Sequence, residues 1–326
     1  MEGIRYLINQ FLVLNKSEWR EKMEDITIII KTFIRIKCVE RLLNSIEKSY
    51  SKCPIIICDD SGDAKKNREN ILKKFSNLKI NYIVAEENIG LSKGRNILVQ
   101  NVKTKYFLLC DDDFIFYKKT DILLARKILE DKNYDILGGL CLHAYRVNFG
   151  SKNEKLELFM RKLQKLFHHY RKVGYRGDID IEGKEVIIDI KKIKYNSKKI
   201  YDTDICENFF LAKTDIVKKV LWYDKLKLNE HEDFFIRAKK AKVKIGVTPE
   251  FKVYHYPETD VKFKKHRTVD YYRDVLQNNN LKKLKIYRNN VGVIQTYSLE
   301  NNKYKKEQDY TKNILGKIKS FYYKHK

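Results

Sequence analysis

The chain has 326 residues, 43% of them hydrophobic and 12% aromatic, which is enough to bury a sizeable core and excludes an intrinsically disordered chain. Its 68 lysine and arginine residues against 43 acidic ones give a net charge of +25, which favours anionic partners such as nucleic acid, lipid headgroups or phosphorylated substrates. A lysine-rich surface that only keeps the protein soluble explains the same excess. No run of about 18 apolar residues occurs, so we expect neither a membrane span nor a signal peptide. The six cysteines lack zinc or Cys-x-x-Cys spacing and indicate reduced core residues of a cytosolic protein.

The first half of the chain predicts alternating strands and helices. Residues 1–24 are expected to form a helical leader, and the β-branched run 26–30 is typical of a buried parallel strand. There follow a helix around 39–46, a strand over 54–58, a helix over 67–75, a strand over 80–84, a helix over 94–100 and a strand over 106–110. This alternation indicates an α/β fold with a mostly parallel sheet and helices on both faces. In such sheets, ligands bind at the carboxyl ends of the strands.

The alternation is lost after Gly138 and Gly139. The pattern then predicts an amphipathic helix over 156–167, strands and loops over 174–200, a core segment over 208–212, a helix from 230 to about 242, strands over 243–247 and 251–256, and a basic amphipathic helix over 314–322.

Three adjacent aspartates, Asp111, Asp112 and Asp113, directly follow the apolar strand at 106–110. Neighbouring carboxylates raise one another's pKa unless a cation neutralises them. A hard divalent ion, bound by one or two carboxylates and completed by substrate phosphates, would do so. A solvated acidic turn with a helix cap explains the same residues without a ligand.

Two further strand-to-helix junctions carry polar motifs. Asp59 and Asp60 end the second strand, where a carboxylate can accept hydrogen bonds from a uracil ring or from ribose hydroxyls, or can form an ordinary Asx turn. Gly90 and Gly94 lie where the helix at 94–100 begins, and glycines there allow close backbone approach. Arg95 at this helix start can pair with a diphosphate.

Acidic residues also open the predicted helix at 230. The helix dipole favours Glu230, Glu232 and Asp233 in a first turn whatever their function. One of these carboxylates can instead serve as a general base for a substrate hydroxyl. His255, on the strand that follows, is a candidate third metal ligand or a packed core histidine.

Taken in order, these motifs resemble those of inverting glycosyltransferases with the GT-A fold. More narrowly, segments 31–35, 104–116 and 208–215, together with Gly138 and Gly139, resemble the ganglioside-type β-1,4-N-acetylgalactosaminyltransferases. The resemblance covers about residues 25–257, and its most specific parts are the blocks around Asp111 and Asn208.

The resemblance implies a Rossmann-like GT-A sheet, a UDP-sugar donor with UDP-GalNAc as the first choice, and Mn²⁺ or Mg²⁺. By this resemblance Asp59 and Asp60 hold the uridine, while Asp111 and Asp113 hold the ribose, metal and diphosphate. Asp233, or its neighbour Glu232, is the implied base, and His255 is the further metal ligand. The implied nucleotide-sugar site comprises Thr32, Phe33, Arg35, Asp59, Asp60, Gly90, Arg95, Asn96, Asp111 and Asp112.

The expected activity is therefore metal-dependent, inverting transfer of a sugar to a hydroxyl of a cell-surface glycan or lipid-linked oligosaccharide. UDP-galactose, UDP-GlcNAc and UDP-glucose are alternative donors on the same scaffold. A catalytically inactive sugar-binding module is another alternative. A basic nucleic-acid-binding protein is an alternative of another class, although the strongest local motifs are acidic and no recognised nucleic-acid motif occurs, so no nucleic-acid partner is expected.

We divide the chain into a leader (1–24), a glycosyltransferase domain (25–260) with an acceptor-side insertion (151–200), and a basic helical C-terminal extension (261–326). The apolar stripe of the extension, interleaved with lysines, suits a helix lying in an anionic headgroup layer. We therefore expect a cytoplasmic protein bound peripherally to the inner face of the cytoplasmic membrane.

Overall fold

The computed structural model describes residues 23–144, 170–171, 173–256, 269–288, 293–300 and 303–310. The predicted leader over 1–22 and the predicted helices over 156–167 and 314–322 lie outside these residues. Within the described ranges, no helix combines the length and the apolarity needed to cross a membrane.

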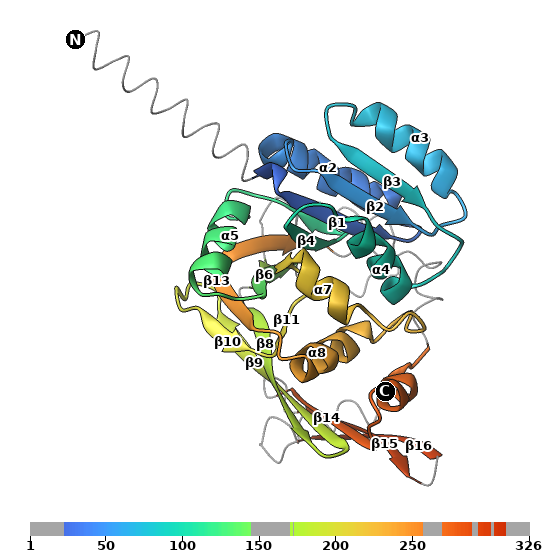
Figure 1. Ribbon diagram of the computed structural model, residues 1–326, viewed down its shortest axis with the longest axis vertical. Helices are drawn as coiled ribbons and strands as arrows, with labels where there is room; N and C mark the ends of the chain where they lie inside the picture. Colours follow the sequence, from blue (N-terminus) through green and yellow to red (C-terminus); the bar gives the residue numbers. More distant parts are fainter. Residues whose placement is uncertain are drawn as a thin grey trace, which may run out of the picture.

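The larger of two sheets has the order β10-β13-β6-β12-β4-β1-β2-β3, with β5 paired to β13 and β7 to β6 (Figure 1). Strands β3, β2, β1 and β4 run parallel, β12 is antiparallel to both of its neighbours, and β6 and β13 are parallel to each other. Its strands are β1 (Ile26–Thr32), β2 (Ile55–Asp59), β3 (Ile80–Val84), β4 (Tyr106–Asp111), β5 (Phe114–Ile115), β6 (Ile136–Ala144), β7 (Tyr170–Arg171), β10 (Tyr201–Thr203), β12 (Phe210–Lys213) and β13 (Ile245–His255).

Helices cover both faces of this sheet, as the alternation predicts. The described helices are α2 (Ile36–Tyr50), α3 (Ala64–Lys74), α4 (Leu91–Asn101), α5 (Ile122–Asp131), α7 (Thr214–Val220), α8 (Glu230–Lys240) and α10 (Tyr272–Asn278). Strand β1 is buried throughout, and its alternating side chains feed two separate cores. Ile28 and Ile30 join the core that contains α2, α3 and α5, whereas Ile29 joins the core that contains α4, α7, α8 and α10.

Strand β13 replaces the two strands predicted over 243–247 and 251–256. Its pairing with β6 is interrupted between Val247 and Lys252, where the register shifts. Pro249 lies in this interval and has no N–H to donate to a ladder. The gap between the two predicted strands is therefore an irregularity within the single strand β13.

A second sheet has the order β11-β8-β9-β14-β15-β16. It consists of β8 (Val173–Glu182), β9 (Glu185–Lys194), β11 (Ile205–Cys206), β14 (Lys283–Arg288), β15 (Val293–Glu300) and β16 (Lys303–Tyr310). Figure 1 shows β8 and β9 beside β14, although β9 and β14 are far apart in the sequence, and these two strands pair in parallel. The described part of the C-terminal extension is thus one short helix and three strands, which corrects the expectation of a helical extension. The boundary predicted at residue 260 also runs through this sheet.

We expect Leu284→Ala to destabilise the whole protein, because Leu284 on β14 is fully buried in the same core as β12 and α8. A Leu→Ala truncation in such a core costs about 2–5 kcal/mol of unfolding free energy. Chemical denaturation followed by tryptophan fluorescence measures this, with Lys285→Ala on the other face of the strand as the matched control. A Leu284→Ala protein as stable as the control would show that the second sheet contributes nothing to the fold.

Candidate functional site

A cleft of about 420 Å³ opens at the carboxyl ends of β1, β2 and β4 and between the starts of α4 and α8. This is the edge of the sheet at which the sequence predicts a ligand. Its lining consists of Lys31, Thr32, Phe33, Arg35, Asp60, Asn88, Gly90, Leu91, Arg95, Asp111, Asp112, Asp113, Asn208, Lys227, Leu228, Asn229, Glu230, His255 and Val269.

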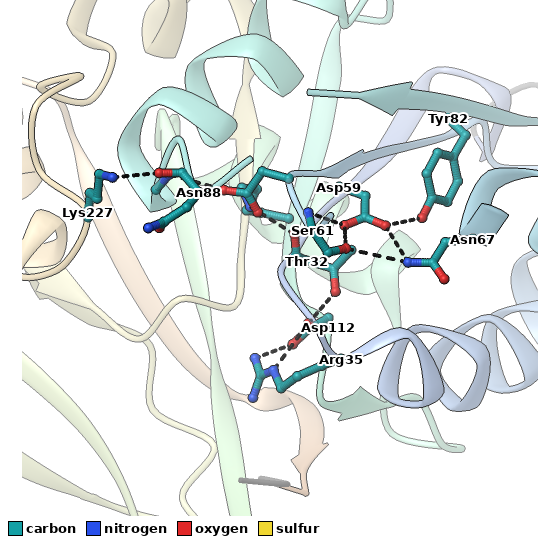
Figure 2. A network of polar contacts seen from close by, with 12 residues as sticks. Thr32, Arg35, Asp59, Ser61, Asn67, Tyr82, Asn88, Asp112 and Lys227 are labelled. Carbon is teal, nitrogen blue, oxygen red and sulfur yellow. Dashed lines mark hydrogen bonds and ion pairs between the residues drawn. The ribbon is translucent and has the colours of Figure 1, made fainter. Parts of the chain in front are cut away.

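The three adjacent aspartates have different partners, although all three line the cleft. Asp111 accepts a hydrogen bond from Arg95 Nη2 (3.1 Å). Asp112 is buried, accepts from Thr32 Oγ1 (2.7 Å) and pairs with Arg35. Arg35 Nη1 also donates to Asp113 Oδ2 (2.7 Å). Figure 2 shows Thr32 and Arg35 on either side of Asp112. The arginines relieve the mutual repulsion that the sequence predicts, yet burial still raises the pKa of Asp112.

Asp113 and His255 form the part of the cleft that fits a cation. His255 Nε2 lies 3.3 Å from Asp113 Oδ1, and this buried oxygen accepts no hydrogen bond from the described residues. Burial raises the pKa of Asp113 and lowers that of His255, but the surrounding charges outweigh burial. His255 and Arg35 lower the pKa of Asp113, whereas Asp113, Asp111 and Glu207 raise the pKa of His255.

The described residues contain no preformed cluster of three or more His, Cys, Asp or Glu ligands. An unpartnered carboxylate oxygen beside an imidazole nitrogen nevertheless suits a divalent ion that takes its remaining ligands from phosphates. Asp113 and His255 are the residues that would hold it.

Asp60 and Asp59 have separate roles. Asp60 lines the cleft, pairs with Lys31 Nζ and accepts from the backbone N–H of Gly90 (3.1 Å). Asp59 is fully buried behind it, where it accepts from Ser61, from Asn67 Nδ2 (2.9 Å) and from Tyr82 Oη (2.7 Å), as Figure 2 shows. The assignment of Asp59 to the uridine is therefore wrong, because its oxygens hold β2, β3 and α3 together.

Gly90 and Gly94 allow close approach, as predicted, but to lysine side chains of the protein itself. A Cβ on Gly90, whose φ is +91°, would lie 2.6 Å from Lys227 Cγ. A Cβ on Gly94 would lie 2.2 Å from Lys31 Cε. The glycines thus leave room for the two lysines that line the cleft.

Arg95 and Asn96, both predicted to contact the nucleotide, bind other groups of the protein. The guanidinium of Arg95 is only 1% exposed and is shared between Asp111 and Glu230. Asn96 lies outside the cleft lining, donates to Trp222 O (2.7 Å) and Asp224 Oδ1 (2.6 Å), and accepts from Trp222 N (2.8 Å). The predicted ligand role of Asn96 is corrected, because Asn96 holds the loop between α7 and α8. Arg95 joins β4 to α8 and also lines the cleft, so its contact with a diphosphate stays a prediction.

Asp233, the predicted base, is buried away from the cleft. Its Oδ2 accepts from Arg237 Nε (3.0 Å), and its Oδ1 accepts from Asn278 Nδ2 (2.9 Å) and Asn279 Nδ2 (2.7 Å). Both oxygens are engaged, so Asp233 anchors α10 to α8 and cannot take a proton from a substrate.

Glu232, the alternative base, also lies outside the cleft lining and accepts from Tyr272 Oη (3.1 Å). Burial raises its pKa. Glu230 is the acidic residue of α8 that reaches the cleft, and its Oε1 accepts from Arg95 Nη1 (2.7 Å). Of the three first-turn carboxylates, Glu230 lines the cleft, whereas Glu232 and Asp233 do not.

Sequence reasoning missed several lining residues. Lys227 donates to the backbone oxygen of Asn88 (2.6 Å) and closes the cleft from the loop before α8, as Figure 2 shows. Asn208 Oδ1 lies 2.7 Å from Nδ1 of His231, whose pKa burial lowers to about 4. No local pattern marks Lys227, whereas Asn208 begins a segment on which the family resemblance rests. Lys31 was visible as a charged residue inside an otherwise apolar strand.

Comparisons with known proteins agree with this geometry. The family model described as Glycosyl transferase family 2 matches residues 27–220. The chain is 27% identical over 217 residues to β-1,4 N-acetylgalactosaminyltransferase 1 of Homo sapiens, covering 65% of this chain and 35% of the relative. It is 34% identical over 114 residues to β-1,4 N-acetylgalactosaminyltransferase 2 of Mus musculus, covering 35% of this chain and 21% of the relative. The chain thus spans about a third or less of the length of these relatives.

Solved structures show the same fold. TarS of S. aureus, residues 1–349 in complex with UDP-GlcNAc, superposes with a TM-score of 0.52 at 14% identity, covering 78% of this chain and 65% of that one. GalNAc-T7 with UDP, GalNAc and Mn²⁺ superposes with a TM-score of 0.51 at 15% identity, covering 72% of this chain and 43% of that one. The predicted GT-A fold is confirmed.

We expect Asp233→Asn to act on stability. The NH₂ group of an asparagine would face one of the N–H groups that now donate to Asp233. The substitution would also leave Arg237 without its buried counter-charge. Removing one partner of a buried pair costs about 3–5 kcal/mol. Thermal and urea unfolding measure the loss against Asp215→Asn, an exposed first-turn aspartate of α7. Normal stability of Asp233→Asn together with lost turnover would instead restore it as a catalytic candidate.

Proposed function

We propose that this chain, which belongs to glycosyl transferase family 2, transfers N-acetylgalactosamine from UDP-GalNAc to a hydroxyl of a glycan or lipid-linked oligosaccharide. The observation that supports this most is the cleft itself. Its floor places Asp113 Oδ1, which accepts no hydrogen bond from the described residues, beside His255, and its wall carries Asp60 at the carboxyl end of β2, two strands from β4. The choice of sugar rests on the similarity to the two N-acetylgalactosaminyltransferases.

In this proposal the donor binds with its uridine at Asp60 and its diphosphate toward Asp113. Asp60, at the end of β2, is positioned by Lys31 and by the N–H of Gly90, and it is the carboxylate available for the uridine. Asp111 and Asp113 lie at the end of β4, which is separated from β2 by β1 in the sheet. The diphosphate would therefore run toward Asp113 and His255, and a divalent ion bound there would neutralise the charge that develops on the leaving UDP.

The base in this proposal is Glu230. Within the described residues its Oε1 accepts a hydrogen bond from Arg95 Nη1, and Oε2 is the oxygen left to accept a proton. The acceptor oxygen attacks the anomeric carbon, the bond from that carbon to the UDP oxygen breaks, and the acceptor proton passes to Glu230. A single displacement of this kind inverts the anomeric centre.

A panel of UDP-sugars tests the donor. With purified protein and Mn²⁺, we expect slow hydrolysis to be fastest with UDP-GalNAc, and EDTA should abolish it. Release of UDP is the measurement, with UDP-GlcNAc, UDP-galactose and UDP-glucose in parallel. Preference for another sugar would reject GalNAc, and the absence of any turnover or UDP binding would reject the enzyme.

Glu230→Gln tests the base. Loss of general base catalysis lowers turnover by about 10²–10⁴-fold. The affinity for UDP, measured by calorimetry, should change little. Glu232→Gln is the matched control on the same helix turn and should retain most activity, because Glu232 contacts Tyr272 outside the cleft. The reverse pattern would show that Glu232 takes the proton.

A further inference from the structure

A chain of side-chain contacts leads from outside the cleft lining to its metal-binding end. Glu207 Oε1 lies 3.2 Å from His143 Nε2, His143 Nδ1 lies 2.7 Å from His255 Nδ1, and His255 Nε2 lies 3.3 Å from Asp113 Oδ1. Glu207 and His143 do not line the cleft.

The backbone fixes this chain of contacts. His143 on β6 and His255 on β13 are register partners in a parallel pair, and His255 is also opposite Phe114 of β5. The two imidazoles lie edge to face with their centroids 4.7 Å apart. Glu207 is held in turn, because its Oε2 accepts the backbone N–H of Cys141 (3.0 Å).

The direction of the hydrogen bonds follows from what each atom can do. An ionised carboxylate only accepts, so His143 must donate its Nε2–H to Glu207. In a neutral imidazole the other nitrogen is then an acceptor, so His143 Nδ1 accepts and His255 Nδ1 carries the hydrogen. The remaining nitrogen of His255, Nε2, is the one that faces Asp113.

We propose that Glu207 and His143 are positioning residues that hold the hydrogen of His255 on Nδ1 and thereby reserve Nε2 as a ligand for the divalent cation at Asp113. This inference rests on the proposed function, which needs that cation. Ligating histidines generally donate their other N–H to a fixed acceptor, and loss of such an acceptor weakens metal affinity by about 10–100-fold. Here the acceptor is a second histidine, itself oriented by a carboxylate.

Two substitutions of His143 distinguish the loss of its hydrogen-bond acceptor from the loss of the ring itself. His143→Leu removes the acceptor of His255 Nδ1–H. His143→Asn retains one, because an asparagine Oδ1 occupies nearly the position of a histidine Nδ1. We expect His143→Leu to weaken Mn²⁺ binding in the presence of UDP by about 10–100-fold, and His143→Asn to restore most of it. Calorimetry and the EPR signal of free Mn²⁺ measure the affinity.

NMR of the ¹⁵N-labelled ring identifies the tautomer of His255 directly and requires neither metal nor turnover. In ¹⁵N-labelled, metal-free protein at a pH where the ring is neutral, we expect the hydrogen on Nδ1 in the unsubstituted chain and in His143→Asn. In His143→Leu we expect it on Nε2. A His255 that carries its hydrogen on Nε2 in the unsubstituted protein would overturn the proposal, as would a His143→Leu variant that binds Mn²⁺ normally.

The two failures are distinguishable. If the unsubstituted protein binds no Mn²⁺ with UDP and transfers no sugar, the proposed function fails, whatever the tautomer. If it does both while the His143 variants behave alike in tautomer and in affinity, only the positioning role fails. If His143→Leu does not fold, the proposal is still tested by the tautomer of His255 in the unsubstituted protein and by the Mn²⁺ affinity of His143→Asn.

Discussion

The buried guanidinium of Arg95 is the interaction on which the cleft depends, because it joins the end of β4 to the start of α8. A charge so far from water is stable only when it is paired and hydrogen-bonded. Asp111 at the end of β4 and Glu230 at the start of α8 supply the two pairs. Replacing Arg95 by a neutral residue would leave two carboxylates facing each other across the site. The geometry of the proposed donor and base sites therefore depends on one side chain, which binds a residue of each.

The cleft has a charge balance unlike that of the whole chain. Five carboxylates line it against four lysine and arginine side chains, whereas the sequence as a whole has a net charge of +25. Three of those four cations, Lys31, Arg35 and Arg95, are already paired with the carboxylates. A phosphate-bearing ligand entering such a cleft brings further negative charge and needs a cation with it. This balance favours a nucleotide sugar with a divalent ion over a nucleic-acid backbone, which is bound by unpaired lysines and arginines.

The sequence predicted the position of the site better than the roles of its members. Asp113 follows a strand that is buried on both faces, and the strand end alone places it at the ligand edge of the sheet. The choice between Asp59 and Asp60 depends on which way each side chain leaves the end of β2, and the partners of Asp59 come from α3 and β3. The partners of Asp233, Asn278 at the end of α10 and Asn279 just after it, are 45 and 46 residues away along the chain, so the local sequence does not show that its oxygens are engaged. Such contacts leave no periodicity for a sequence pattern to detect.

The second sheet escaped prediction for a related reason, and its position bears on specificity. Its central pairing joins β9 to β14 across nearly a hundred residues, and neither strand shows which partner it will have. The family match ends at residue 220, before α8, α10 and strands β14 to β16 begin. Glu230, the proposed base, therefore lies in the part of the chain that the family pattern does not specify, and Asp233 ties that part together through α10. The proposed nucleotide contacts at the ends of β1, β2 and β4 lie inside the match, whereas the proposed base and His255 lie beyond it. Later elements that differ among relatives would let the acceptor change while the strand ends that contact the nucleotide stay the same.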